Sequence, residues 1–116
     1  MVDPALPDDL PGRELAEIPS VEVISRAAVL LMSAAAERLG LGGPGDPVDL
    51  DEARRLITAL AGLVTASAEY VGVHAGPLRD GLRSLQLAFR EASPWPDEPG
   101  QGPGERLTGA VYPAAR

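Results

Sequence analysis

The strongest constraint in this sequence is a heptad pattern between positions 53 and 71. Apolar or small residues recur there at alternating spacings of four and three: Ala53, Ile57, Leu60, Val64, Ser67 and Val71. Such a seam lies along one side of an α-helix and suits packing against another helix. Asp49 and Glu52 precede it as a D-x-x-E pair, in which each side chain can satisfy a backbone N–H at a helix start. We therefore predict a helix that begins after Asp49 and ends near Gly72, a residue suited to the left-handed stop.

The composition agrees with a helical core. Hydrophobic residues make up 45% of the chain but aromatic residues only 3%, so the core must consist mainly of alanine, valine, leucine and isoleucine. Side chains this small suit closely packed helices better than a β-sandwich. A chain of 116 residues has room for one modest domain.

A helix is also predicted from Ser20, as its cap, to Arg38 and Gly40. Its apolar residues cover about half of its circumference, which is wider than the ~100° stripe that one packed face requires. One helical neighbour would not cover this surface. We therefore expect a homo-oligomer, most simply a homodimer, in which the first helix forms the interface. The residues assigned to that interface are Ile24, Ala28, Leu31 and Ala35.

A third helix is predicted to begin with Pro77 and to end before Pro94. Its apolar side consists of Leu78, Leu82, Leu85 and Phe89, and its polar side of Arg79, Asp80, Arg83, Gln86 and Arg90. Gly81 within it marks either a close helix crossing or a tolerated glycine.

The expected fold is all-α. It is an antiparallel three-helix bundle over residues 20–92 with non-helical, Pro/Gly-rich arms on both sides. Residues 1–19 form a flexible acidic N-terminal arm, and residues 93–116 form a C-terminal arm.

No motif in the sequence predicts an enzyme. The "GLGGPG" stretch that starts at Gly40 follows a helix rather than a strand, so it is a loop and not a dinucleotide fingerprint. His74 is the only histidine and there is no cysteine, so His74 has no companion for a metal site or a nucleophile. The acids Asp49, Asp51 and Glu52 are explained by the helix start. We expect no catalytic residue, no cofactor and no metal.

Charge and targeting patterns limit the partners. The formal net charge is −7, and all ten basic residues are arginine, a bias that suggests a GC-rich genome. An acidic chain is repelled by phosphate backbones, which argues against general nucleic-acid binding. The N-terminus has no basic flank or long apolar run, so we expect neither a signal peptide nor a membrane span, and a cytoplasmic protein.

Four stretches resemble one known family. They are "IPSVEVISRAAVLLMSAAAERLGL", "DLDEARRLITALAGLVTASAEYVG", "PLRDGLRSLQLAFREAS" and "PDEPGQGPGERLTG", and their order is similar to that in the actinobacterial branch of the domain of unknown function 1844 family. The resemblance covers about Ile18 to Tyr112. It implies a small cytoplasmic helical protein without an assigned enzymatic activity. Related genes often lie near those of translation initiation factor and ribosomal proteins, which implies an alternative role as a translation- or ribosome-associated accessory factor.

The segment "SPWPDEPGQGPGE" from Ser93 to Glu105 holds the only tryptophan, Trp95. Its prolines favour an extended path with a low ordering cost. One interpretation is that Trp95 and Tyr112 dock on the bundle or on a protein partner while the chain between them crosses the surface. The other is a disordered acidic tail. On the first interpretation the chain is a non-enzymatic oligomerising and protein-interaction module.

Overall fold

The computed structural model describes residues 12–111, and these residues contain helices but no β-strand. Three long helices, α1 (Ser20–Arg38), α2 (Leu50–Ser67) and α3 (Ala75–Ala92), pack against one another. Shorter elements are η1 (Gly12–Glu17), η2 (Gly72–His74) and α4 (Glu105–Thr108). The chain is therefore all-α over the described residues, as predicted.

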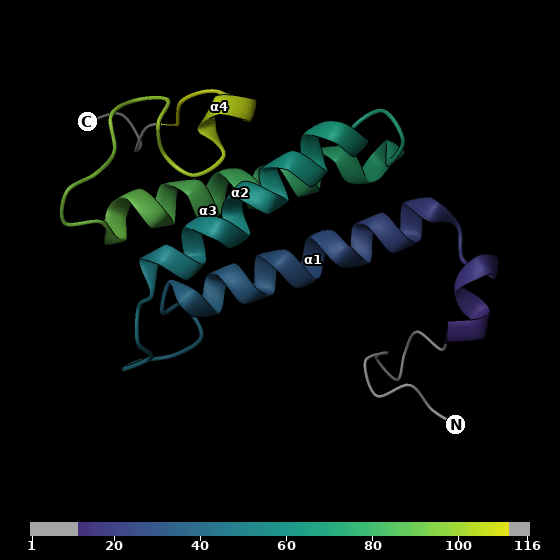
Figure 1. Ribbon diagram of the computed structural model, residues 1–116, viewed down its shortest axis with the longest axis horizontal. Coiled ribbons are helices and arrows are strands. Elements are labelled where there is room, and N and C mark those ends of the chain that lie inside the picture. Colours follow the sequence, from purple (N-terminus) through teal and green to yellow (C-terminus); the bar gives the residue numbers. More distant parts are fainter. Residues whose placement is uncertain (1–11, 112–116) are drawn as a thin grey trace.

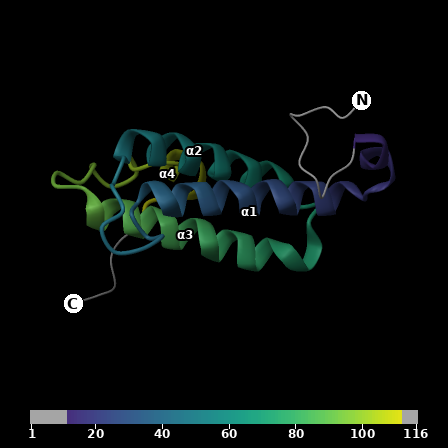
Figure 2. The ribbon, with the colours of Figure 1, turned by 90° about the horizontal axis from the view of Figure 1, so that it is seen from below.

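The helices form three layers. Helix α1 lies on one side of the α2–α3 pair, and α4 with the chain around it lies on the opposite side (Figure 1). Seen from the α1 side, α1 lies between α2 and α3, and α4 is behind them (Figure 2). The α1–α2 loop and the loop after α3 are at the same end of the bundle in both views. The two faces of the α2–α3 pair are thus covered by segments from opposite ends of the described chain.

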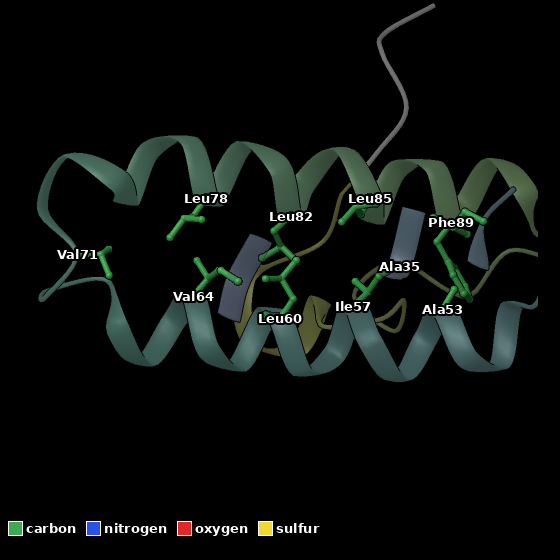
Figure 3. Packing of buried hydrophobic residues seen from close by; sticks show 13 residues of the cluster. Ala35, Ala53, Ile57, Leu60, Val64, Val71, Leu78, Leu82, Leu85 and Phe89 are labelled. Carbon is green, nitrogen blue, oxygen red and sulfur yellow. The ribbon is translucent and has the colours of Figure 1, made fainter. Parts of the chain in front are cut away.

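The predicted seams form the core. All six heptad residues of the second predicted helix are buried, and so are Leu78, Leu82, Leu85 and Phe89 on α3. Side chains from the two helices interdigitate along the α2–α3 contact, and Ala35 of α1 belongs to the same buried cluster (Figure 3). Burial on this scale is the main source of stability in a domain of this kind.

Helix boundaries match the sequence patterns at some ends and differ at others. Asp49 caps α2, because its Oδ1 accepts the Glu52 N–H at 3.1 Å. Gly40, at φ +76°, closes α1 in a Schellman motif, with the Leu41 N–H donating to the Ala36 carbonyl. The predicted Ser20 cap is wrong, since Ser20 is the first helical residue and makes no capping bond.

The second end that differs is the stop of α2. This helix ends at Ser67, five residues before Gly72, and Gly72 with φ +57° begins η2 instead. Helix α3 begins at Ala75, two residues before Pro77. Pro77 therefore lies in the first turn of α3. The N–H groups of a first turn have no helical acceptor, so a residue without an N–H is tolerated there.

Both arms contain helical turns that were not predicted. Residues 12–17 of the N-terminal arm form η1, and α4 lies inside the C-terminal arm. Gly81 marks the close crossing that was one of its two interpretations: a Cβ added there would lie 2.8 Å from Met32 Cε of α1. None of the helices in the described part is long and apolar enough to cross a membrane.

Candidate interaction site

Trp95 is the most exposed large side chain on a loop that the structure fixes in place. Its side chain is 88% exposed. Helix α3 ends at Ala92 because Ser93 adopts an extended conformation and the next residue is proline. The Ser93 hydroxyl donates to the Phe89 carbonyl at 2.8 Å, which ties the start of the loop to the last turn of α3. Trp95 therefore does not dock on its own bundle, one of the two places expected for it.

Two arginines hold the other side of this loop. Arg54 of α2 donates to both carboxylate oxygens of Asp97, at 3.0 and 3.3 Å. Arg90 of α3 donates to the Asp97 carbonyl at 2.7 Å and to the Glu98 carbonyl at 3.0 Å. The Arg54 guanidinium also lies 4.9 Å from the ring centroid of Phe89. Trp95 thus stands between two anchored points.

Arg90 also forms a buried ion pair with Glu105. Its Nε donates to Oε2 at 2.7 Å and its second terminal nitrogen to Oε1 at 2.8 Å, a bidentate arrangement. The Arg90 side chain is 9% exposed and that of Glu105 is fully buried. Burial on its own raises the pKa of Glu105. The Arg90 hydrogen bond, the Gly100 and Val111 backbone bonds and the Arg90 charge outweigh burial, so the pKa lies below its ordinary value.

Gln86 fixes the next part of the segment. Its Nε2 donates to the Pro103 carbonyl at 3.0 Å and to the Thr108 hydroxyl at 3.1 Å. Gly104, at φ +76°, lies so close to α2 that an added Cβ would be 2.5 Å from the Ala61 Cβ. Only glycine combines this backbone conformation with this approach. The segment from position 97 to 111 is therefore an ordered cover on α2 and α3.

These contacts correct the predicted polar side of α3. Arg79, Asp80 and Arg83 are exposed as expected, but Gln86 is buried and Arg90 nearly so. Sequence reasoning also missed Glu105 as a structural residue. The sequence held one signal for this role. Few acidic residues follow α3, and Glu105, directly after the "GPG" stretch that starts at Gly102, is one of them, so it is one of few possible partners there for the α3 arginines.

The interface predicted on α1 needs correction. Ala28 and Ala35 are completely buried within the chain's own core, so neither offers surface to a partner. Ile24 and Leu31 are half-buried and pack against the same core. Tyr112, the remaining predicted site residue, lies outside the described residues. The structure therefore does not bring Trp95 together with the four α1 residues.

A different stripe of α1 faces solvent. Val23, Ala27, Leu30 and Ala34 follow at spacings of four, three and four, so they lie along one side of the helix. Leu30 is 70% exposed and Val23 37%; Ala27 is also exposed and Ala34 half-buried. We call these four residues the outer stripe. It is flanked by the exposed Glu22–Arg26 ion pair.

The surface has two hollows, of which the second adjoins the covering segment. One, of about 690 Å³, lies at the loop end of the bundle and is lined by Arg38, Pro47, Val48, Asp49, Leu50, Asp51, Ala92 and Pro94. The other, of about 370 Å³, lies between α2, α3 and α4 and has Arg79, Asp80 and Arg83 on its polar side. Both combine apolar and charged lining.

No group of three or more histidine, cysteine, aspartate and glutamate side chains is placed to hold a metal ion among residues 12–111. His74 is exposed at the end of η2. The observable features of this surface are instead exposed apolar side chains on ordered elements.

Comparisons of the chain with protein-family models, with curated proteins and with solved structures find no match in any of the three. The resemblance to the domain of unknown function 1844 family therefore stays a prediction from the residues alone.

Proposed function

We propose that this chain is a non-enzymatic protein-interaction module that forms homodimers through the outer stripe of α1. The observation that carries the proposal is the exposure of this stripe on a helix that already packs another of its sides against the core. A helix with one packed side has no need of a second apolar stripe. An exposed apolar seam of this kind is typical of a surface that binds another helix.

The order of side chains in the outer stripe supports pairing with a second copy. It alternates large and small residues: Val23, Ala27, Leu30, Ala34. Positions 23 and 34, and likewise 27 and 30, lie symmetrically about the point between Ala28 and Val29. Two α1 helices related by a two-fold axis at that point and running antiparallel would therefore place each large residue opposite an alanine. Alternation of large and small side chains lets facing helices interdigitate, and a two-fold interface must be self-complementary in this way.

The proposal takes each subunit to be an antiparallel three-helix bundle with Pro/Gly-rich arms. One observation supports this order for α1 and α2. The Asp49 N–H donates to the Arg38 carbonyl at 2.7 Å, so the end of α1 lies beside the start of α2.

The test is light scattering after size exclusion on the full chain. We expect the wild-type chain to have the mass of a dimer and Leu30→Glu to have that of a monomer, because a charge at the centre of the stripe would be buried without a partner. Val73→Glu is the matched control, since Val73 is an equally simple apolar residue that is 88% exposed in η2. A monomeric wild-type chain, or a Leu30→Glu variant that stays dimeric, would contradict the proposal.

A second candidate role is that of a translation- or ribosome-associated accessory factor. It is favoured by Arg79 and Arg83, which are exposed on α3 and make no ion pair with any residue in the described range. The net charge of −7 opposes contact with RNA. We expect co-sedimentation with ribosomes at low salt if this role holds, and its loss in an Arg79→Ala/Arg83→Ala double variant but not in Arg55→Ala. Absence of co-sedimentation at low salt would remove this candidate.

A further inference from the structure

We propose that the loop end of the bundle, with Trp95 and the adjoining hollow of about 690 Å³, binds a basic peptide segment of a partner protein. This surface does not include the outer stripe of α1, so it is independent of homodimer formation. The class of ligand is an extended segment that carries arginine or lysine together with an apolar side chain. Three properties of this end of the molecule support the assignment.

The first property is that Trp95 is exposed on a backbone that is restrained on both sides. Pro94 and Pro96 flank it and restrict the backbone. The Ser93–Phe89 bond precedes it, and the bonds of Asp97 to Arg54 and Arg90 follow it. Because the backbone on both sides of Trp95 is already restrained, binding through this side chain has a lower ordering cost than binding through one on a mobile loop. Exposed tryptophans of this kind are the residues on which binding energy concentrates in protein interfaces.

The second property is the adjoining hollow. Pro94, directly before Trp95, is one of its lining residues, and the α1–α2 loop supplies Pro47 and Val48 on the other side. Val48 is 52% exposed and Leu41 of the same loop 60%. Trp95 therefore directly follows a residue that lines a hollow with both apolar and charged side chains.

The third property is charge, and it selects the occupant. Asp51 lines the hollow and makes no ion pair with any described residue. Two exposed acids, Asp46 and Glu91, are next in sequence to lining residues. They also make no ion pair with a described residue. The one arginine of the hollow, Arg38, is already paired with Asp49 and Glu52. The uncompensated charge is thus negative. It attracts a basic segment, whose guanidinium or ammonium groups also interact favourably with an indole face.

The same charge argues against a second copy at this place. A two-fold contact would bring Asp46, Asp51 and Glu91 of one subunit towards the same acids of the other. Like charges that meet at an interface disfavour it. The partner class is therefore a chain of opposite charge.

Trp95 is the only tryptophan, so its fluorescence reports on this surface alone. The probe is a blocked hexapeptide of alternating arginine and leucine, and its counterpart has glutamate in place of arginine. We expect saturable change of Trp95 emission with the arginine peptide and none with the glutamate peptide. Because the attraction is between exposed charges, we expect the affinity to fall about fivefold or more when salt rises from about 0.05 M to about 0.5 M.

Variants separate this proposal from non-specific attraction. Asp51→Asn should lower the affinity for the arginine peptide about threefold or more. Asp80→Asn, which changes an exposed acid of the other hollow, should leave this affinity unchanged. Trp95→Ala, followed by calorimetry, should abolish measurable binding. Equal response to both peptides, equal affinity of the two aspartate variants, or no response at millimolar peptide would overturn the proposal. Loss of the dimer in Trp95→Ala would also overturn it, since the occupant would then be a second copy.

Discussion

Replacement of Glu105 by glutamine tests whether the C-terminal segment is an integral part of the fold. Glu105 accepts two hydrogen bonds from Arg90 and one from the Gly100 N–H, and no part of its side chain is exposed. Glutamine has nearly the same shape, but its NH₂ group would replace one of the two oxygens and would then face an N–H donor instead of accepting from it. The substitution therefore removes the charge and one acceptor while it leaves the volume unchanged.

The expected cost is about 3 kcal/mol of the free energy of unfolding. Breaking a buried ion pair by changing one partner costs about 3–5 kcal/mol. The lower end applies here, because Arg90 keeps its bonds to the Asp97 and Glu98 carbonyls. With an m-value of about 1.5 kcal/mol/M for urea, the midpoint of unfolding should fall by about 2 M.

The effect should depend on pH in a defined direction. The pKa of Glu105 is lower in the folded chain than its ordinary value, so the folded state favours the ionised form. The stabilisation is then complete above the unfolded pKa of about 4.3 and is lost as the pH falls through the folded pKa. The difference in stability between the wild-type chain and Glu105→Gln should be largest near neutral pH and should shrink below about pH 4.

The assay is urea unfolding followed by both far-UV circular dichroism and Trp95 emission, from neutral to acid pH. Glu98→Gln is the control, because Glu98 is exposed and forms no ion pair with a described residue; it should unfold like the wild-type chain. A loss of less than about 1 kcal/mol for Glu105→Gln at neutral pH would refute the argument, since that is the scale of an exposed ion pair.

Three further substitutions test the packing, each measured by the same unfolding assay. Gly104→Ala should cost about 3 kcal/mol, because φ is +76° and the new Cβ would meet Ala61; Gly45→Ala, at φ +83° in open space, should cost only about 1 kcal/mol, and equal losses would contradict the close approach. Asp49→Ala should cost about 1 kcal/mol through loss of the α2 cap, and no loss would show that water replaces it. Phe89→Ala should cost about 3–5 kcal/mol, since Phe89 is 1% exposed; a smaller loss would mean that the site collapses.

Local patterns were enough to predict the three long helices and most of their buried residues. A helix repeats every 3.6 residues, so the spacing of apolar residues from Ala53 to Val71 identifies the buried side without any knowledge of the neighbours. The Asp49 cap is equally local, because donor and acceptor are three residues apart. The width of the apolar surface on the first helix predicted that one neighbour would not cover it, but it placed the uncovered part at Ile24, Ala28, Leu31 and Ala35, whereas Leu30 is the most exposed large apolar residue of this helix.

Contacts between distant segments explain what these patterns missed. Gln86 and Arg90 have the spacing of a solvent-facing row on α3, yet a segment without any period covers them. Its glycines and prolines allow a path that brings Glu105 within 2.7 Å of Arg90, fifteen residues earlier in the chain.

The position of Trp95 likewise depends on the anchors of Asp97 on α2 and α3 as well as on its neighbours in sequence. Periodicity therefore determines which side of each helix is apolar. The burial of Glu105 and the position of Trp95 depend on how the C-terminal segment is bonded across two helices, because hydrogen bonds and ion pairs between distant residues leave no repeating pattern in the sequence.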